Sequence, residues 1–250
     1  MPEPAIGVFG AGRLGRAIHR TATAEGAVVH LYDARRPDQW DAAPAPDVLV
    51  DCSAPAAVAQ AVALSARLGV PLVECVSGLD EERLRLLDAH AAGTPVVLAP
   101  NLSLGNYLQT RALRHIAEVV ATMERAGITG AVPEAAVLER HPATKAHRPS
   151  TTATRLAQEW LRHTGSPTAD VASLRSGPAV SDHEIRLAWP EQALTIGHQV
   201  HSLDAAASGA IGAAGWSVGR APGTYPIHEV FDDMLATMGG AVTDRQEDPR

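Results

Sequence analysis

The sequence of 250 residues contains no block of basic residues and no long apolar run. No segment approaches the roughly 18 consecutive apolar residues that a membrane-spanning helix needs. The net charge of −7 argues against a nucleic-acid partner. Only two cysteines occur, Cys52 and Cys75, and their spacing suits neither a metal site nor a disulfide framework. The start, MPEPAIGVFGAG, has no charged segment followed by an apolar run, so we expect no signal peptide and a cytoplasmic location.

The composition, with 46% hydrophobic residues, is sufficient for one large or two modest cores. Over the first hundred residues, short apolar runs alternate with amphipathic segments. The strands expected there are Ala5–Phe9, Val28–Tyr32, Val48–Asp51, Pro71–Cys75 and Pro95–Leu98, and the helices are Arg16–Ala24, Val58–Leu68 and Glu81–Ala91. Strands and helices alternating through short connections predict a parallel sheet that is covered by helices on both faces.

After Pro100 the pattern changes. The last three strands of this part follow one another without helices between them, which predicts a second, α+β domain with a mixed or antiparallel sheet. The helices expected are Gly105–Ala126, Thr152–His163 and a closing Asp204–Val218, and the strands are Ala135–Glu139, Val171–Leu174, Glu184–Trp189 and Ala193–Val200. We therefore predict a first domain over residues 1–107, completed by 204–250, and a second over 108–203.

A glycine-rich turn, GVFGAGRLGRAI, joins the first expected strand to the first helix. Gly10 would make the tight turn, Gly12 would let the backbone approach a pyrophosphate, and Gly15 would let helix and strand pack closely. The N–H groups of the turn, including those of Arg13 and Leu14, lie where a helix N-terminus attracts phosphate. The turn favours dinucleotide binding, and a purely structural glycine turn is the alternative.

The residue that binds the cofactor ribose is expected at the end of the second strand. There Asp33 could bind a ribose 2′-hydroxyl, whereas Arg35 could hold a 2′-phosphate. NADH and NADPH are both consistent with this pair, and a solvated charged turn is the alternative. Three loops that follow later strands complete the expected cofactor edge with Ser53, Cys75, Ser77 and Asn101. We interpret Cys75 as a structural thiol of this edge, because no neighbouring base suggests a nucleophile.

The stretch ERHPATKAHRPSTTAT concentrates His141, Lys145 and His147 ahead of a turn of hydroxyl residues. Histidine suits proton transfer near neutral pH, and lysine can donate a proton as an ammonium group or bind a carboxylate. The turn opens a helix, so its N–H groups together with Ser150, Thr151 and Thr152 could seat a second carboxylate. Surface residues without a function are the alternative for each of the three basic side chains. For His183 and His198, core or interface packing is favoured over catalysis.

These motifs together resemble the dihydrodipicolinate reductase family over most of the chain. The stretch Glu139–Thr154 aligns without gaps to the family signature E-x-H-H-x-x-K-x-D-x-P-S-G-T-A. DCSAP, CVSG and APNLSLG are similar to its D-F-[ST]-x-P, G-T-T-G and A-x-N-[FM]-S-[LIV]-G. SLRSGPAVSDHEI and LTIGHQVHSL are similar to two further family motifs. Five positions depart from the family pattern. Pro142 replaces a histidine, His147 an aspartate, Thr151 and Ser181 each a glycine, and Leu203 an arginine.

The resemblance implies a Rossmann-type domain, an oligomerisation role for the second domain, and a homotetramer. It implies that His141 and Lys145 form the acid–base pair. Lys145, His147, Ser150, Thr151 and Thr152 would then bind the carboxylates of the substrate. The implied activity is NAD(P)H-dependent reduction of an unsaturated cyclic imine carboxylate. A divergent reductase of secondary metabolism, a non-reducing enzyme and a nucleotide-binding regulator on the same scaffold are the alternatives.

Overall fold

A computed structural model describes residues 3–42, 44–177 and 181–243. The chain forms two compact units, one made of Met1–Leu102 with Leu203–Arg250 and the other of Ser103–Ser202. Among the described residues, no helix combines the length and the apolar character that crossing a membrane would require.

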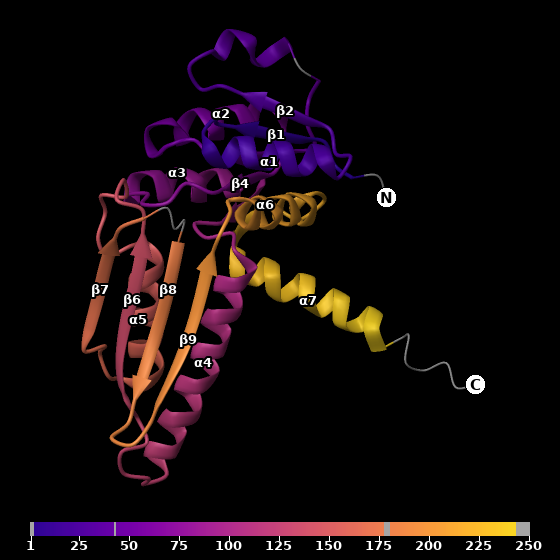
Figure 1. The fold of residues 1–250 in the computed structure, drawn as a ribbon. Helices are drawn as coiled ribbons and strands as arrows, with labels where there is room; N and C mark the ends of the chain where they lie inside the picture. Colours follow the sequence, from indigo (N-terminus) through magenta and orange to yellow (C-terminus); the bar gives the residue numbers. More distant parts are fainter. Residues whose placement is uncertain (1–2, 43, 178–180, 244–250) are drawn as a thin grey trace. The chain divides into compact units, whose positions relative to one another are not determined.

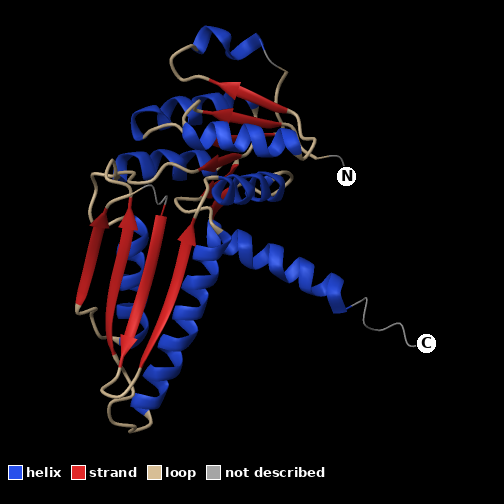
Figure 2. Ribbon diagram, in the orientation of Figure 1, coloured by secondary structure: helices blue, strands red, loops and turns tan. Residues whose placement is uncertain are grey.

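The first unit is built on a six-stranded parallel sheet in the order β10-β5-β4-β3-β1-β2. Figure 1 labels β1, β2 and β4 of this sheet, and Figure 2 colours its strands red. This arrangement confirms the expected Rossmann-type α/β domain. Its strands are β1 (Ile6–Phe9), β2 (Val29–Tyr32), β3 (Val48–Asp51), β4 (Leu72–Glu74), β5 (Pro95–Leu98) and β10 (Gly223–Pro226). Its helices are α1 (Arg13–Ala24), α2 (Val58–Leu68), α3 (Glu81–Ala91), α6 (Asp204–Ser217) and α7 (Ile227–Thr243), with short 3₁₀ turns at Pro37–Ala42 and Pro55–Ala57.

Both faces of this sheet are buried, as the continuous apolar strands predict. Phe9, Leu49, Leu72 and Val96 lie on one face and pack against apolar side chains of α2 and α3. The alternate strand residues point to the other face, where α6 contacts β3, β4 and β5 and packs against α1. The side chain at any strand end therefore projects to one of two defined sides.

The strand β10 and the helix α7 were not anticipated from the sequence. The strand is the segment GTYP, which pairs in parallel with β5 and completes one edge of the sheet. Glycine and proline are depleted in strands, so this four-residue segment carries almost no strand signal of its own. Pairing with β5, rather than local propensity, determines its conformation.

The second unit is a four-stranded mixed sheet in the order β7-β6-β8-β9. Its strands are β6 (Glu134–His141), β7 (Asp170–Arg175), β8 (Ser181–Ala188) and β9 (Ala193–Val200), and its helices are α4 (Leu104–Arg125) and α5 (Thr151–Thr164). The strand β6 pairs in parallel with β7 and antiparallel with β8, which confirms a mixed sheet. The two helices pack together along the sheet (Figure 1) around a core that includes Leu113, Val137, Leu156, Trp160 and Ile185.

Candidate active site

The residues predicted to hold a dinucleotide follow the C-terminal ends of five parallel strands in the first unit. Because these strands are parallel neighbours, their ends meet at the same edge of the sheet. The residues are Gly10, Gly12, Arg13, Leu14 and Gly15 after β1, Asp33 and Arg35 after β2, Ser53 after β3, Cys75 and Ser77 after β4, and Asn101 after β5. The fold thus collects the whole predicted set along one edge.

The three glycines of the turn have different structural roles. Gly10 has a φ of 115°, and a Cβ there would come within 2.8 Å of the Ser53 backbone. A Cβ on Gly15 would collide with the carbonyl oxygen of Gly10. At Gly12 a Cβ would meet nothing, and this residue caps α1 without any side-chain hydrogen bond. The open backbone at the start of α1 fits a pyrophosphate, since the first N–H groups of a helix have no partner within it.

The carboxylate of Asp33, which is predicted to bind the ribose, forms hydrogen bonds with Arg35. The guanidinium of Arg35 donates from Nε to Asp33 Oδ1 at 2.9 Å and from Nη2 to Oδ2 at 2.7 Å. The backbone N–H of Arg35 also donates to Oδ1, at 2.9 Å. These hydrogen bonds, the side-chain ones first, lower the pKa of Asp33 to about 2. The acid and the base that could discriminate between NADH and NADPH are therefore coupled in one exposed pair.

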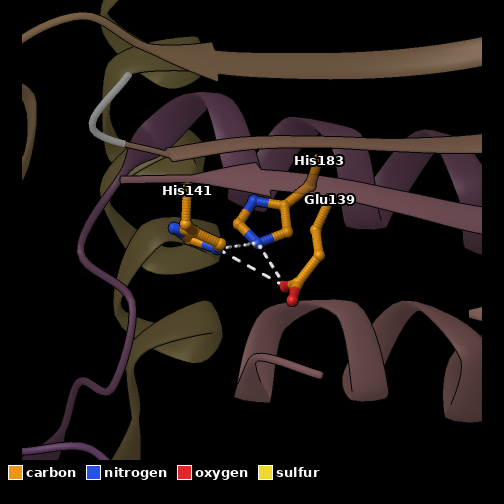
Figure 3. A group of neighbouring side chains, drawn as sticks. All are labelled: Glu139, His141 and His183. Atoms are coloured by element: carbon orange, nitrogen blue, oxygen red, sulfur yellow. Dashed lines mark hydrogen bonds and ion pairs between the residues drawn. The ribbon is translucent and has the colours of Figure 1, made fainter. Parts of the chain in front are cut away.

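In the second unit, Glu139, His141 and His183 form a buried cluster (Figure 3). The Nε2 atoms of His141 and His183 lie 3.2 Å apart. Glu139 Oε2 lies 3.4 Å from the first of these atoms and 3.6 Å from the second. Glu139 and His141 are two residues apart on β6, so both point to the same face, and His183 is the register partner of Glu139 on β8.

The Glu139 carboxylate is held by several donors. Oε1 accepts from Ser173 Oγ at 2.6 Å and from Arg175 Nη2 at 2.8 Å, and both oxygens accept from the Ser150 N–H, at 3.1 and 3.0 Å. Burial alone would raise the pKa of Glu139, but hydrogen bonds from Ser150, Ser173 and Arg175 outweigh it and lower that pKa to about 2. Glu139 is therefore a fixed negative charge beside the two histidines.

Two imidazoles and one carboxylate are a donor set that can hold a transition metal. Here the carboxylate already forms an ion pair with Arg175, and Lys145 interacts electrostatically with both groups. Burial, then the neighbouring His141, lower the pKa of His183 to about 4, so His183 is neutral near pH 7. Positive charge is thus already present around Glu139. We interpret the cluster as a hydrogen-bonded acid–base group rather than a cation site.

Arg175 also anchors the loop that carries the predicted site residues. Its Nε donates to the Lys145 carbonyl at 2.9 Å, and its Nη2 donates to the His147 carbonyl at 2.6 Å. The Lys145 side chain is half-buried, and this burial lowers its pKa. The side chain of His147 is exposed, and no contact observed in the described residues links it to the cluster.

The hydroxyl turn begins α5 directly beside the cluster. Ser150 caps the helix by accepting from the Ala153 N–H at 3.2 Å, and its Oγ lies 3.0 Å from His183 Nε2. Thr151 and Thr152 form the first turn of α5. The structure thus brings His141 and Ser150 into one hydrogen-bonded group. Arg175 holds the backbone between these two residues through the carbonyls of Lys145 and His147.

Several members of this group were not singled out from the sequence. His183 was expected to pack, and it is buried, yet it also contacts His141. Glu139, Ser173 and Arg175 were not proposed as site residues. Alternation along β6 could have placed Glu139 and His141 on one face, but the partners on β7 and β8 follow from sheet register alone.

The chain matches sequence profiles of known proteins over most of its length. The profile "Dihydrodipicolinate reductase, N-terminus" matches residues 4–102, and "Dihydrodipicolinate reductase, C-terminus" matches residues 110–231. The chain belongs to the dihydrodipicolinate reductase family. Among curated members, 4-hydroxy-tetrahydrodipicolinate reductase of Xanthomonas campestris pv. campestris is 32% identical over 238 residues, which cover 88% of this chain and 93% of that protein. The enzyme of the same name from Thiobacillus denitrificans is 32% identical, covering 74% and 73%.

A solved structure supports the same fold for this member of the family. Dihydrodipicolinate reductase from Paenisporosarcina sp. TG-14, with dipicolinate bound, superposes with a TM-score of 0.66, covering 91% of this chain and 99% of that one. Its sequence is 16% identical, so the likeness concerns the fold alone. This chain therefore belongs to a family of oxidoreductases, and its N-terminal domain is of the dinucleotide-binding type.

Proposed function

We propose that this protein is an NAD(P)H-dependent reductase of an unsaturated cyclic imine carboxylate, acting as 4-hydroxy-tetrahydrodipicolinate reductases do. The observation that carries the proposal is the buried contact of His141 with Glu139 and His183, on the strand that leads into the Lys145 loop. A surface histidine would need no such environment. A histidine that exchanges protons needs a fixed tautomer, and its neighbours supply it.

Reduction of an imine or a conjugated double bond adds one hydride and one proton across that bond. A bound nicotinamide would supply the hydride, and the glycine turn with Asp33 and Arg35 would hold the cofactor. The ammonium of Lys145 would donate the proton, and the lowered pKa of Lys145 makes that donation easier. His141 would supply a new proton to Lys145, or would itself donate the proton to the substrate. Glu139 would stabilise positive charge that develops on His141.

The substrate class follows from the groups around α5. Lys145 and the first turn of α5, which starts at Thr151, would bind carboxylates through charge-assisted hydrogen bonds. The dipicolinate bound to the Paenisporosarcina protein is a ring with two carboxylates, which fits this expectation by analogy. From the family resemblance we also propose a homotetramer. His147, Ser150 and Thr152 complete the proposed carboxylate contacts.

A second candidate is a reductase with a different imine or enamine substrate. Pro142 stands where the family signature has its second histidine, and the nearest alternative, His147, is exposed. One of the usual contacts to a carboxylate is therefore absent at that position. A substrate with a single carboxylate, or one placed differently, would need no replacement.

The test follows the absorbance of NADH and NADPH with the product of dihydrodipicolinate synthase, for the wild type, Lys145→Ala and the exposed control Glu134→Gln. We expect oxidation of cofactor by the wild type and the control, and loss of at least about a hundredfold in Lys145→Ala, as for removal of a general acid. Cofactor binding without turnover would contradict the proposed substrate, the product of dihydrodipicolinate synthase, and would support the second candidate or a regulator.

A further inference from the structure

Two carboxyl groups are buried side by side at the ends of neighbouring strands in the first unit. Asp51 ends β3 and Glu74 ends β4, and the two residues are direct register partners. They are 0% and 1% exposed. The strand alternation that places Leu49 and Leu72 against α2 and α3 directs Asp51 and Glu74 to the same side. Two negative charges buried side by side would destabilise the fold unless another group or a proton compensates them.

Each carboxyl group holds the loop that follows its own strand. Asp51 Oδ1 accepts from the Ser53 N–H at 2.8 Å, and Glu74 Oε1 accepts from the Val76 N–H at 2.7 Å. These loops carry Ser53 together with Cys75 and Ser77, which we propose as cofactor contacts. The conformation of both loops therefore depends on the protonation state of the Asp51–Glu74 pair.

The second oxygen of each group has no conventional partner. Asp51 Oδ2 and Glu74 Oε2 are buried, and no other group of the described residues donates a hydrogen bond to either oxygen. The two carboxyl groups are close enough to form a hydrogen bond with each other when one of them carries a proton. The pair in turn acts on the neighbouring thiols of Cys52 and Cys75. Burial, and then the two acids, raise the pKa of Cys52 to about 12, and burial raises that of Cys75 well above its usual range. The thiols are thus neutral, and no basic side chain of the described chain contributes to the pKa of either acid.

We propose that Glu74 and Asp51 share one proton, and that Glu74 is thereby a positioning residue that keeps the loops after β3 and β4 in the conformation that binds the dinucleotide. The last clause rests on the proposed function. A carboxylic acid facing a carboxylate removes the charge repulsion and supplies the donor that the two buried oxygens lack. Loss of the shared proton places two negative charges beneath the loops and drives them apart.

The Asp51–Glu74 pair should lose its shared proton in the alkaline pH range. Burial, followed by the charge of Asp51, raises the pKa of Glu74 to about 9. The test measures the Kd of NADPH and NADH by cofactor fluorescence near pH 7 and near pH 10, for the wild type and Glu74→Gln. If only the protonated pair binds, the wild-type Kd rises about tenfold over this interval, whereas glutamine cannot ionise and the ratio in Glu74→Gln stays below about threefold. The exposed control Glu82→Gln should follow the wild type.

A second measurement does not depend on the cofactor. Infrared spectra should show a protonated carboxyl band that the wild type loses between about pH 7 and pH 10 and that Glu74→Gln lacks. In thermal unfolding, the stability of Glu74→Gln relative to the wild type should grow as pH rises towards 9. The reason is that unfolded Glu74 releases its proton near the ordinary pKa, while folded Glu74 retains it.

The outcomes separate this inference from the proposed function. A wild-type Kd that stays constant up to about pH 10, or an equal rise in Glu74→Gln, overturns the positioning role. Absence of the carboxyl band in the wild type overturns the shared proton itself. A protein that binds neither cofactor near pH 7 contradicts the proposed cofactor use, and the infrared result then still decides whether the pair shares a proton. Binding without any imine reduction leaves the inference standing.

Discussion

His141 and His183 face each other through Nε2 atoms 3.2 Å apart, with their rings inclined by 72°. When both rings are neutral, one Nε2 must donate and the other must accept, so the tautomer of one fixes the tautomer of the other. Ser150 Oγ, 3.0 Å from the same nitrogen of His183, adds a hydroxyl that can adapt to either arrangement. His183 therefore determines how a proton on His141 is held, even though it is not proposed to contact the substrate.

The first prediction concerns His183 and acid stability. The pKa of His183 in the folded protein is about 4, well below the ordinary histidine value. As the pH falls below that ordinary value, His183 is therefore protonated in the unfolded chain but stays neutral in the folded protein. Stability from this residue is complete above about pH 7 and is lost towards pH 4. Between about pH 7.5 and pH 5, urea unfolding should show a loss about 2 kcal/mol larger in the wild type than in His183→Gln. The exposed control His115→Gln should match the wild type, and an equal loss in all three proteins would refute the neutral state of His183.

A second prediction concerns the ion pair between Glu139 and Arg175. Both side chains are almost wholly buried, so Arg175→Met leaves a carboxylate without its charged partner and should cost about 3–5 kcal/mol in the free energy of unfolding. The contrasting variant is Arg140→Met, because Arg140 pairs with Asp182 and Glu184 but is 38% exposed. That loss should stay near or below about 1 kcal/mol. The double variant Arg175→Met with Glu139→Leu should recover part of the loss, and equal losses for the two arginines would contradict the buried pair.

These two contacts mark the limit of what the sequence could predict. The stretch from His141 to Thr152 is continuous, so its basic residues and its hydroxyl turn can be recognised as one motif. The partners of Glu139 come from β7 and β8, at Ser173, Arg175 and His183, and only the strand register brings them together. A single sequence gives strand alternation but not register. The same limit concealed the pairing of Asp51 with Glu74, although each strand was expected.

The fold class was predictable because the physics behind it is local. Alternating apolar runs and amphipathic segments require helices on both faces of a parallel sheet, and that sheet is present. In the second domain, β7, β8 and β9 follow one another without helices between them, which predicted a mixed or antiparallel sheet, and the sheet is mixed because β6 and β7 are parallel and joined through α5. The segment from Gly223 to Pro226 was missed because its strand depends wholly on pairing with β5.

A third prediction concerns cofactor preference. Arg35 neutralises the charge of Asp33 through two side-chain hydrogen bonds. Substitution of either residue therefore leaves the other one able to bind the ribose of the cofactor. Arg35→Ala should shift the ratio of Kd values towards NADH, since the carboxylate can then accept from a 2′-hydroxyl. Asp33→Ala should shift it towards NADPH, since Arg35 can then bind a 2′-phosphate. Each shift should be about tenfold, measured by fluorescence titration with both cofactors. Shifts in the same direction for both variants would show that the pair does not read the ribose.

The last prediction separates the structural glycines from the glycine that a phosphate would approach. In Gly15→Ala the new methyl group collides with the Gly10 carbonyl oxygen, so α1 must move away from β1. That variant should lose several kcal/mol of stability, as overpacked cores do. In Gly12→Ala the methyl group meets no protein atom, so the Tm should stay close to that of the wild type. If a pyrophosphate lies against this backbone, the same methyl group should weaken NADPH binding at least about tenfold, because the close approach is lost. Thermal unfolding and cofactor titration of the two variants provide the test, and a Gly12→Ala protein that binds cofactor as the wild type does would mean that the turn is structural only.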